Sequence, residues 1–450
     1  MKKNLIQPLN SYHAARSKFH AISEIDTYMQ IQTNPFAAIL ATTKTHTMPI
    51  SIPATKSLSL ILKLKPKLPI MQATKMEEKT TEARGGASTP QPQRLRDKKV
   101  KDLIPDKKRL VEVPYTASLA DTMNALLANR VVAVPVAAPP GHWIGAGGSM
   151  IVESDKQTGA ARKHYIGMVT MLDVLAHIAG NDADPAEVDG GNLDKNMQVP
   201  VSSIIGHCLE SLSLWTLNSN TSILDCMEVF SKGIHRALVP VDSHMENISG
   251  VELVESASSY RMVTQMDLLK FLKAHEHELR GILARPVREL GAVSDIVFGV
   301  TDKTKVIDAI RCMNRASLNA VPIVESTEDI EEDHGQLINA KDRKVVGTFS
   351  ATDLRGCPIP LLQSCLQQNV MDFIHKLCGI PLHEASGLRN STKELITCRP
   401  ESLLREVVDK VVKNHVHRVW VVNESGLLVG LISLTDIIRA ARVWMLSEPA

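Results

Sequence analysis

The sequence predicts an α/β (α+β) fold that is built from four copies of one unit. The first observation is a Ser/Thr-x-x-Asp motif that recurs at intervals of 83 to 94 residues, each time between an apolar strand pattern and an apolar helix pattern. Its four copies are Thr170–Asp173, Thr264–Asp267, Ser350–Asp353 and Ser433–Asp436. The second observation is the alternation of short strand and helix patterns around every copy, which is typical of α/β units. Because a long-period repeat decides the architecture, the chain is expected to consist of four similar units.

The first unit, residues 98–180, shows every element of the repeat. It opens with the short segment VKDLI, and Ser118 is a suitable N-cap for the amphipathic helix that follows. The predicted elements are a helix over 118–129, a buried strand over 131–137, a strand over 165–170 and a helix over 171–178.

The other units repeat this order at residues 199–275, 283–356 and 389–445. Helices are predicted over 222–233, 266–275, 305–317, 402–414 and 435–444, and strands over 236–242, 260–264, 319–326, 344–350, 417–425 and 427–433. An apolar stretch at 357–388 separates units three and four and has no counterpart in the first two units. We therefore expect it to form a helical insertion.

Residues 1–95 lack periodicity and are rich in Ser, Thr, Lys and Pro. Three interpretations remain open. The composition is typical of an organelle transit peptide or of a disordered tail. Alternatively, translation begins at Met71 or Met76, which would make the extension an artefact of the gene model.

Charge and cysteine content argue against several functions. Residues 1–75 carry ten Lys or Arg and two acidic residues, so the rest of the chain holds 41 basic and 47 acidic residues. Such a mildly acidic body argues against nucleic-acid binding, and no apolar stretch approaches the roughly 18 residues of a membrane span. The seven cysteines are scattered without a C-x-x-C pair. This favours reduced, buried thiols in an intracellular protein over a metal site or disulfides.

The repeated motif offers a binding chemistry. An ionised Asp at a helix start has two acceptor oxygens that can hold both hydroxyls of a ribose, and the Ser or Thr leaves the strand on the same side. No nucleophile has a base beside it, so we predict no catalytic residues. The alternative interpretation of each Asp is a helix N-cap worth about 1 kcal/mol, and it stays open.

The order of elements resembles the cystathionine β-synthase (CBS) domain, a β-α-β-β-α module, over about residues 98–445. The resemblance implies four tandem CBS modules arranged as two pseudo-twofold pairs, unit one with two and unit three with four, after a disordered N-terminal extension. The four-unit layout, the His417–Arg418 pair and the ending ISLTDI are similar to the γ regulatory subunits of AMP-activated and sucrose-non-fermenting-related protein kinases. Residues 111–141 resemble the plant γ-like branch in particular.

This resemblance implies a non-catalytic regulatory subunit that senses adenine nucleotides (AMP, ADP or ATP), with a catalytic α subunit and a scaffold β subunit as partners. It assigns ribose binding to the eight motif residues named above. It assigns phosphate binding to cations of the same units, namely His417, Arg418, Arg236, His235 and Arg130. Arg236 precedes Pro240 by four residues where the γ pattern has two, and Arg130 precedes Pro135 by five. We therefore expect both side chains to be displaced.

Glycine stands three residues before the hydroxyl in units one, three and four, at Gly167, Gly347 and Gly430, where it permits close ligand approach. Unit two has Arg261 instead, which either blocks its site or contacts phosphate. Because the second pair keeps both glycines and the His–Arg pair, we expect Asp436 and Asp353 to be the more important carboxylates.

Two other functions remain open. The chain could be a free-standing CBS adaptor for another enzyme or a transporter, with or without a nucleotide. It could also be an enzyme with regulatory CBS pairs, although residues 1–97 are too short for a catalytic domain. We expect a cytoplasmic or nuclear location, with organelle targeting by residues 1–75 as the alternative.

Overall fold

The computed structural model describes residues 94–138, 163–180, 193–206, 214–241, 259–327, 332–352, 357, 359–378 and 395–448. All of them belong to one compact body, which contains Arg94–Ala450. Residues 1–93 of the predicted N-terminal extension, the predicted ribose ligand Asp353 and most of the loop between the two strands of unit one lie outside the described residues. The last residue of that extension, Leu95, is buried and begins η2. No helix in the described ranges is long and apolar enough to cross a membrane.

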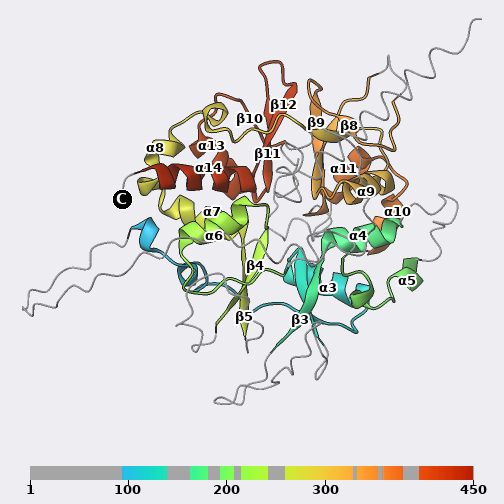
Figure 1. The fold of residues 1–450 in the computed structure, drawn as a ribbon. Helices are drawn as coiled ribbons and strands as arrows, with labels where there is room; N and C mark the ends of the chain where they lie inside the picture. The colour runs from blue at the N-terminus through green and yellow to red at the C-terminus, as the bar shows by residue number, and fades with distance from the viewer. Residues whose placement is uncertain are drawn as a thin grey trace, which may run out of the picture. The chain divides into compact units, whose positions relative to one another are not determined.

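The fold is mixed α/β, as predicted (Figure 1). After η2 (Leu95–Asp97), unit one contains η3 (Val100–Leu103), β1 (Val113–Pro114), α3 (Leu119–Asn129), β2 (Ala133–Ala137), β3 (Tyr165–Thr170) and α4 (Met171–Ala179). After α5 (Leu193–Asn196), unit two contains η4 (Val201–Ser203), α6 (Ile223–Ser231), β4 (Arg236–Pro240), β5 (Tyr260–Thr264) and α7 (Gln265–Ala274).

The second half of the chain repeats this order after η7 (Glu276–Glu278) and α8 (Arg280–Leu283). Unit three contains η8 (Val287–Leu290), β6 (Phe298–Thr301), α9 (Val306–Arg315), β7 (Ala320–Val324), β8 (Ile338–Asn339) and β9 (Val345–Ser350). The helices α10 (Ile359–Cys365) and α11 (Val370–Cys378) follow. Unit four contains β10 (Thr397–Cys398), α13 (Leu404–Asn414), β11 (Arg418–Val422), β12 (Leu428–Ser433) and α14 (Leu434–Ser447).

Local sequence signals explain these elements. Ser118 caps α3 as predicted, because its hydroxyl accepts the backbone N–H of Asp121. The helix α13 has no side-chain cap and depends on its amphipathic pattern. Its buried residues lie at the i, i+3, i+4 and i+7 positions of one face, namely Leu404, Val407, Val408 and Val411.

Each unit forms a small sheet of the same topology. In units one and four the first strand runs parallel to the second, and the second runs antiparallel to the third, in the orders β1-β2-β3 and β10-β11-β12. Unit three has the same core with an added edge strand, β8-β6-β7-β9. In unit two a single parallel bridge from Thr216 to Leu238 stands beside the β4-β5 pair. The repeat predicted from the sequence is therefore present in all four sheets.

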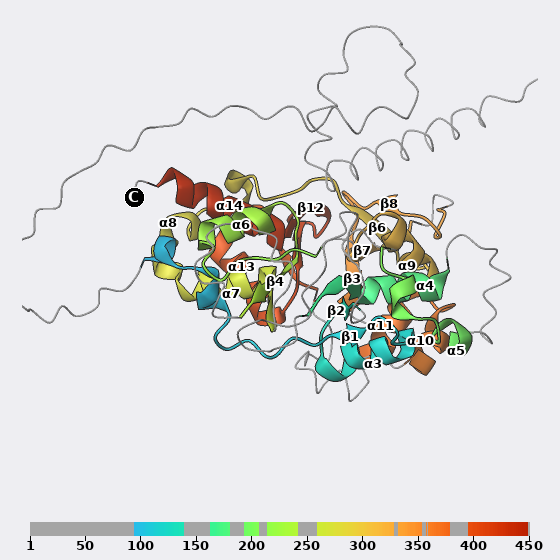
Figure 2. The same ribbon diagram turned by 60° about the horizontal axis from the view of Figure 1, so that its bottom comes forward.

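Apolar cores join the units in two directions. The largest core packs α4 of unit one against α9 of unit three, and the second packs α14 of unit four against α6 and α7 of unit two (Figures 1 and 2). Smaller clusters join unit one to unit two through Tyr165 and Tyr260, and unit three to unit four through Val345 and Trp420. Sheet contacts therefore form the pairs, and helix contacts join one pair to the other.

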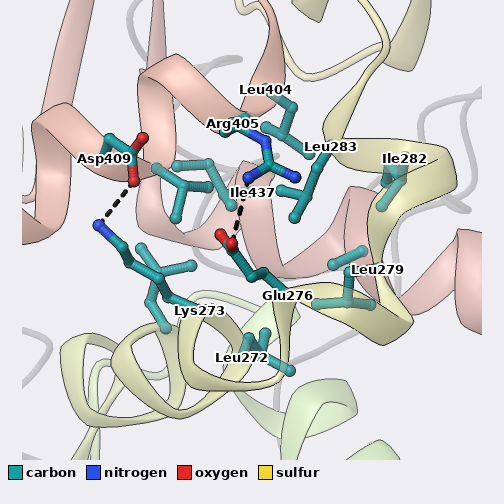
Figure 3. A pocket seen from close by; sticks show the side chains of 13 residues that line it. Leu272, Lys273, Glu276, Leu279, Ile282, Leu283, Leu404, Arg405, Asp409 and Ile437 are labelled. Atoms are coloured by element: carbon teal, nitrogen blue, oxygen red, sulfur yellow. Dashed lines mark hydrogen bonds and ion pairs between the residues drawn. The ribbon is translucent and has the colours of Figure 1, made fainter.

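Two ion pairs border the helical interface between units two and four. Lys273 Nζ lies 2.6 Å from Asp409 Oδ1, and Arg405 Nη1 lies 3.2 Å from Glu276 Oε1 (Figure 3). The leucine-lined hollow beside them measures about 20 Å³. That volume holds one water at most, so this interface is a packing feature and no ligand site.

One helix of the stretch expected as an insertion, α11, has a counterpart in each of the other three units. In each unit, one isolated β-bridge joins two residues. One lies directly before the opening segment of that unit, and the other lies directly before the first helix of the partner unit. The bridges are Lys99↔Ser222, Pro200↔Ser118, Pro286↔Leu403 and Asn369↔Lys305. In the fourth bridge, Asn369 lies directly before α11, so α11 is the opening segment of unit four. The expectation that the first pair has no equivalent is wrong, since a 3-10 turn in three units becomes a regular helix in the fourth.

Candidate functional site

The strand register places the four motifs in equivalent positions. In each unit the Ser or Thr of the motif pairs directly with the first residue of the neighbouring strand. These pairs are Thr170↔Ala133, Thr264↔Arg236, Ser350↔Ala320 and Ser433↔Arg418. The residue before each partner, Val132, His235, Asn319 or His417, accepts a backbone hydrogen bond from the residue after the hydroxyl. The junction of strand and helix is thus built four times in the same way.

In units one, two and four the motif forms a capping box. The hydroxyl of Thr170, Thr264 or Ser433 donates to the Oδ2 atom of the Asp three residues later, at 2.5 to 2.7 Å. The backbone N–H of the Ser or Thr donates to the same oxygen, and the Asp N–H donates back to the hydroxyl. In unit three Ser350 Oγ accepts the N–H of Thr352. In these three motifs the Ser or Thr is therefore the N-cap, and the Asp, which the sequence suggested as the N-cap, occupies position N3 of the capping box. Ribose binding remains a prediction.

The carboxylates of the three boxes differ in exposure. Asp173 is completely buried, whereas the side chains of Asp267 and Asp436 keep 21% and 17% of their surface exposed. Asp436 Oδ1 lies 2.9 Å from Arg439 Nη1, and Asp267 Oδ2 lies 2.7 Å from Lys107 Nζ. A ligand at the carboxylates of units two and four would compete with these cations, and it could not reach Asp173 without rearrangement.

A cavity of about 1000 Å³ brings the motifs together. Thr170, Thr264 and Ser433 line it, and Thr352 contributes from unit three. All five predicted phosphate-binding residues line it as well, namely Arg130, His235, Arg236, His417 and Arg418. Such a volume is at the upper end of the range for small-molecule sites, roughly 300 to 1000 Å³. Residues that were predicted as separate sites in the repeats therefore line one cavity.

This cavity is strongly basic. Its described lining includes seven Lys or Arg residues and two Asp residues. Side chains that motif reasoning missed supply much of this charge: Lys107, Lys108, Arg109 and Lys270, together with His415. The run Lys107–Arg109 was visible in the sequence as three consecutive cations, but nothing in its position pointed to a site 160 residues away. A concave wall of one charge sign attracts a ligand of the opposite sign, here a polyanion.

The expected displacement of Arg236 is wrong. Its distance from Pro240 in the sequence differs from the γ pattern, yet Arg236 pairs with Thr264 as Arg418 pairs with Ser433. Compared with the γ pattern, the proline lies two residues further along the strand, whereas the arginine lies at the equivalent position. Arg130, in contrast, lies three residues before Ala133, the residue that is equivalent to Arg236.

Arg130 and His415 share a strained backbone position that ends a helix. Their φ angles of 55° and 53° lie in the left-handed region, where unit two has Gly233 at 91°. A side chain other than glycine costs about 1 kcal/mol there. Both side chains line the cavity, and strain of this kind is commonly kept at functional positions.

Gly430 and Gly347, which lie three residues before the motif hydroxyls, leave space for neighbouring atoms of the protein. A Cβ on Gly430 would lie 2.6 Å from Ser294 O, and one on Gly347 would lie 3.2 Å from Ile323 Cδ1. The interpretation that these glycines permit ligand approach therefore has a competing explanation. In unit two, Arg261 Nε donates instead to the carbonyl of Lys107, at 3.1 Å.

Comparisons with known proteins agree with this architecture. A family model described as the CBS domain matches residues 388–443. The "SNF1-related protein kinase regulatory subunit gamma-like PV42a" of Arabidopsis thaliana is 57% identical over 353 residues, which are 78% of this chain and 96% of that relative. The corresponding PV42b protein of the same plant is 56% identical over 354 residues, 79% of this chain and 97% of its own length. The "5'-AMP-activated protein kinase subunit gamma" of Kluyveromyces lactis is 24% identical over 349 residues, 77% of this chain and 89% of its own.

Proposed function

The chain belongs to the family of gamma-like regulatory subunits of SNF1-related protein kinases, and we propose that it regulates a Ser/Thr protein kinase by binding adenine nucleotides in the basic cavity. In this proposal it performs no catalysis of its own. Its partners are a catalytic α subunit and a scaffold β subunit. The names of the two plant relatives support the regulatory part, and the chemistry of the cavity supports the nucleotide part.

One observation carries the nucleotide part: hydroxyl and cationic side chains of several units line one cavity. A nucleotide needs acceptors for its ribose and cations for its phosphates. In units two and four an arginine lies directly across the strand pair from the capped hydroxyl. We assign phosphate binding to Arg418, Arg236 and the adjacent His417 and His235.

We assign ribose binding in unit four to Ser433, which lines the cavity, together with Asp436 of the same capping box, which is not itself among the lining residues. The Oδ2 atom of Asp436 belongs to the capping box, and its Oδ1 atom pairs with Arg439, whose side chain is 53% exposed. The Arg439 side chain is more than half exposed, so a ribose hydroxyl that displaces it returns the guanidinium to water. Ser350 and Asp353 of unit three are the second proposed ribose site.

Regulation follows if the nucleotide binds two states of the kinase assembly with unequal affinity. The ligand then shifts the assembly toward the state that it binds more tightly, by no more than that difference in binding free energy. Because the cavity is bordered by all four units, a ligand there can alter how the two pairs pack.

Calorimetric titration of AMP and ATP into the wild type and the Asp436→Ala variant tests the nucleotide assignment. Losing a hydrogen bond to a charged group costs about 1.5–3 kcal/mol, so we expect affinity at one site to fall about tenfold or more. The matched control is Asp121→Ala, which breaks a similar capping box that does not line the cavity. Equal binding by the wild type and Asp436→Ala at every site would overturn the assignment.

Affinity purification from plant tissue tests the partner assignment. We expect a Ser/Thr kinase catalytic subunit and a β-type scaffold to co-purify in stoichiometric amounts. Recovery of a transporter or an unrelated enzyme in their place would favour the adaptor function.

A further inference from the structure

A linker outside the CBS strands crosses the unit two motif. Residues Asp106–Leu110 connect η3 to β1 of unit one, and they lie against unit two. We propose that Lys107 is a built-in occupant of the unit two site, so that Asp267 holds this chain's own ammonium group in place of a ribose. This inference rests on the proposed function, because it states which of the four motifs takes a nucleotide.

The hydrogen bonds at Asp267 leave its inner oxygen no capacity for a ligand. Lys107 Nζ lies 2.7 Å from Oδ2. The same oxygen accepts the N–H of Thr264 at 2.9 Å and its hydroxyl at 2.7 Å. A carboxylate oxygen has two lone pairs, so three donors saturate Oδ2, and a ribose could approach only Oδ1, beside the Lys107 ammonium group. The Lys107 and Asp267 side chains are only 28% and 21% exposed, which reduces the screening of their attraction by water.

The linker is anchored on both sides of Lys107. The Lys107 N–H donates to Ile104 O at 3.1 Å, and its carbonyl accepts Arg261 Nε at 3.1 Å. Three residues later, Leu110 packs on the cluster of Leu238 and Tyr260. Arg261, which the sequence left open as a blocking or phosphate-binding residue, is in this reasoning the positioning residue that holds Lys107 over Asp267.

The equivalent linker of the second pair contains no such cation. Residues 291–297 connect η8 to β6 of unit three and cross unit four, where Ser294 forms a two-way backbone bridge with Leu431. Their sequence is GAVSDIV, without Lys or Arg. Asp436 pairs instead with Arg439 of its own helix. Of the two linkers that the structure describes, only the one in the first pair therefore places a lysine on its partner unit's carboxylate.

Equilibrium dialysis with labelled AMP and ATP on the full-length chain tests the proposal. Lys107→Met removes the ammonium and keeps the length of the side chain. We expect it to bind one more nucleotide per chain than the wild type, and Asp267→Asn in the same background to abolish that gain. Lys101→Met is the matched control, because Lys101 is an exposed lysine on the preceding η3 turn. An unchanged number of nucleotides in Lys107→Met would overturn the proposal.

A thermal double-mutant cycle separates this inference from the proposed function. If neither the wild type nor Lys107→Met binds nucleotide, the proposed function fails, and the melting temperatures of Lys107→Met, Asp267→Asn and the double variant decide the inference. We expect the double variant to melt at a higher temperature than the two single shifts predict together. Additive shifts in melting temperature would mean that Lys107 does not interact with Asp267.

Discussion

Gly430→Ala tests whether this glycine serves the packing of the chain. The new Cβ would lie 2.6 Å from both Ser294 O and Val293 Cγ1, closer than carbon atoms approach such neighbours. The valine methyl can rotate away, but the Ser294 backbone is held by two hydrogen bonds to Leu431, at 2.9 and 2.8 Å. The substitution must therefore displace backbone where the linker of unit three crosses unit four.

The expected cost follows from three contributions. Overpacking of a tight site costs about 1–3 kcal/mol, and each weakened backbone hydrogen bond costs about 1 kcal/mol at most. Against this, alanine restricts the unfolded chain and returns about 0.4–1 kcal/mol. We therefore expect Gly430→Ala to lower the free energy of unfolding by about 2 kcal/mol.

Urea denaturation followed by circular dichroism measures this difference, and Gly347→Ala is the control. It changes the equivalent position of unit three, where the nearest atoms are the flexible ends of Ile323 and Met371 at 3.2 Å. We expect this variant to lose clearly less stability. If Gly430→Ala were as stable as Gly347→Ala while losing nucleotide affinity, the reasoning would be refuted and the glycine would serve the ligand.

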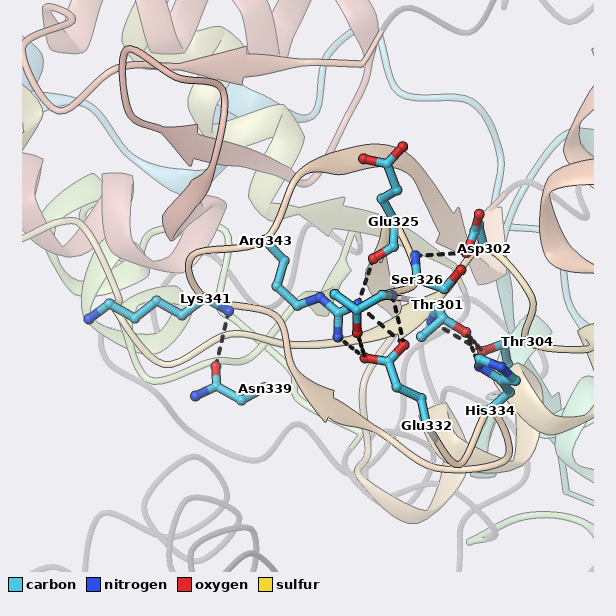
Figure 4. A network of polar contacts seen from close by, with 11 residues as sticks. Thr301, Asp302, Thr304, Glu325, Ser326, Glu332, His334, Asn339, Lys341 and Arg343 are labelled. Carbon is cyan, nitrogen blue, oxygen red and sulfur yellow. Dashed lines mark hydrogen bonds and ion pairs between the residues drawn. The ribbon is translucent and has the colours of Figure 1, made fainter. Parts of the chain in front are cut away.

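Three further outcomes are expected. Arg236→Ala and Arg418→Ala should each weaken ATP binding about tenfold in calorimetry. Arg418→Ala should also lower the melting temperature, because Arg418 Nη1 donates to a carbonyl of unit three at 2.6 Å. If Arg236→Ala bound ATP as tightly as the wild type, Arg236 would not be equivalent to Arg418 in phosphate binding. Burial raises the pKa of Glu332, but hydrogen bonds from Arg343 and a threonine outweigh it and lower that pKa below its usual value (Figure 4). The carboxylate therefore stabilises the fold above its unfolded pKa of about 4.3 and loses that effect as the pH falls. Melting curves should show less acid destabilisation between about pH 5 and 3 in Glu332→Gln than in the wild type, and identical pH profiles would exclude this role. Burial raises the pKa of Cys226 to about 12, so its thiol should react with a disulfide reagent at pH 8 only after denaturation; mass spectrometry of the labelled native chain would reveal any contradiction.

The repeat was predictable because local signals define it. A strand, a capping hydroxyl and an Asp three residues later recur in the sequence, and the structure forms the same junction in every unit. The side chains of five of the seven cysteines are described, and all five are buried and free, as expected. These features depend on neighbouring residues, which a sequence displays directly.

The errors arose where long-range pairing decides the structure. Pro240 was an unsuitable reference for Arg236, because cross-strand hydrogen bonds set the register and a proline only marks a place that needs no N–H donor. The role of α11 depends on one bridge between Asn369 and Lys305. Lys107 reaches a carboxylate 160 residues away, and no periodicity in the sequence records that contact.

The two linkers explain why four copies of one motif need not give four equal sites. Each linker joins a unit's opening segment to its first strand and crosses the motif of the partner unit. In the second pair a two-way backbone bridge holds Ser294 against Leu431, close to Gly430, and Asp436 pairs with Arg439 of its own helix. In the first pair Arg261 replaces that glycine, holds the linker by a side-chain hydrogen bond, and places Lys107 on Asp267. The exchange of glycine for arginine thus accompanies a change in the cation that pairs with the carboxylate, from Arg439 of the motif's own helix to Lys107 of the linker, which is why the glycine and the carboxylate should be interpreted together when ligand sites are assigned in such repeats.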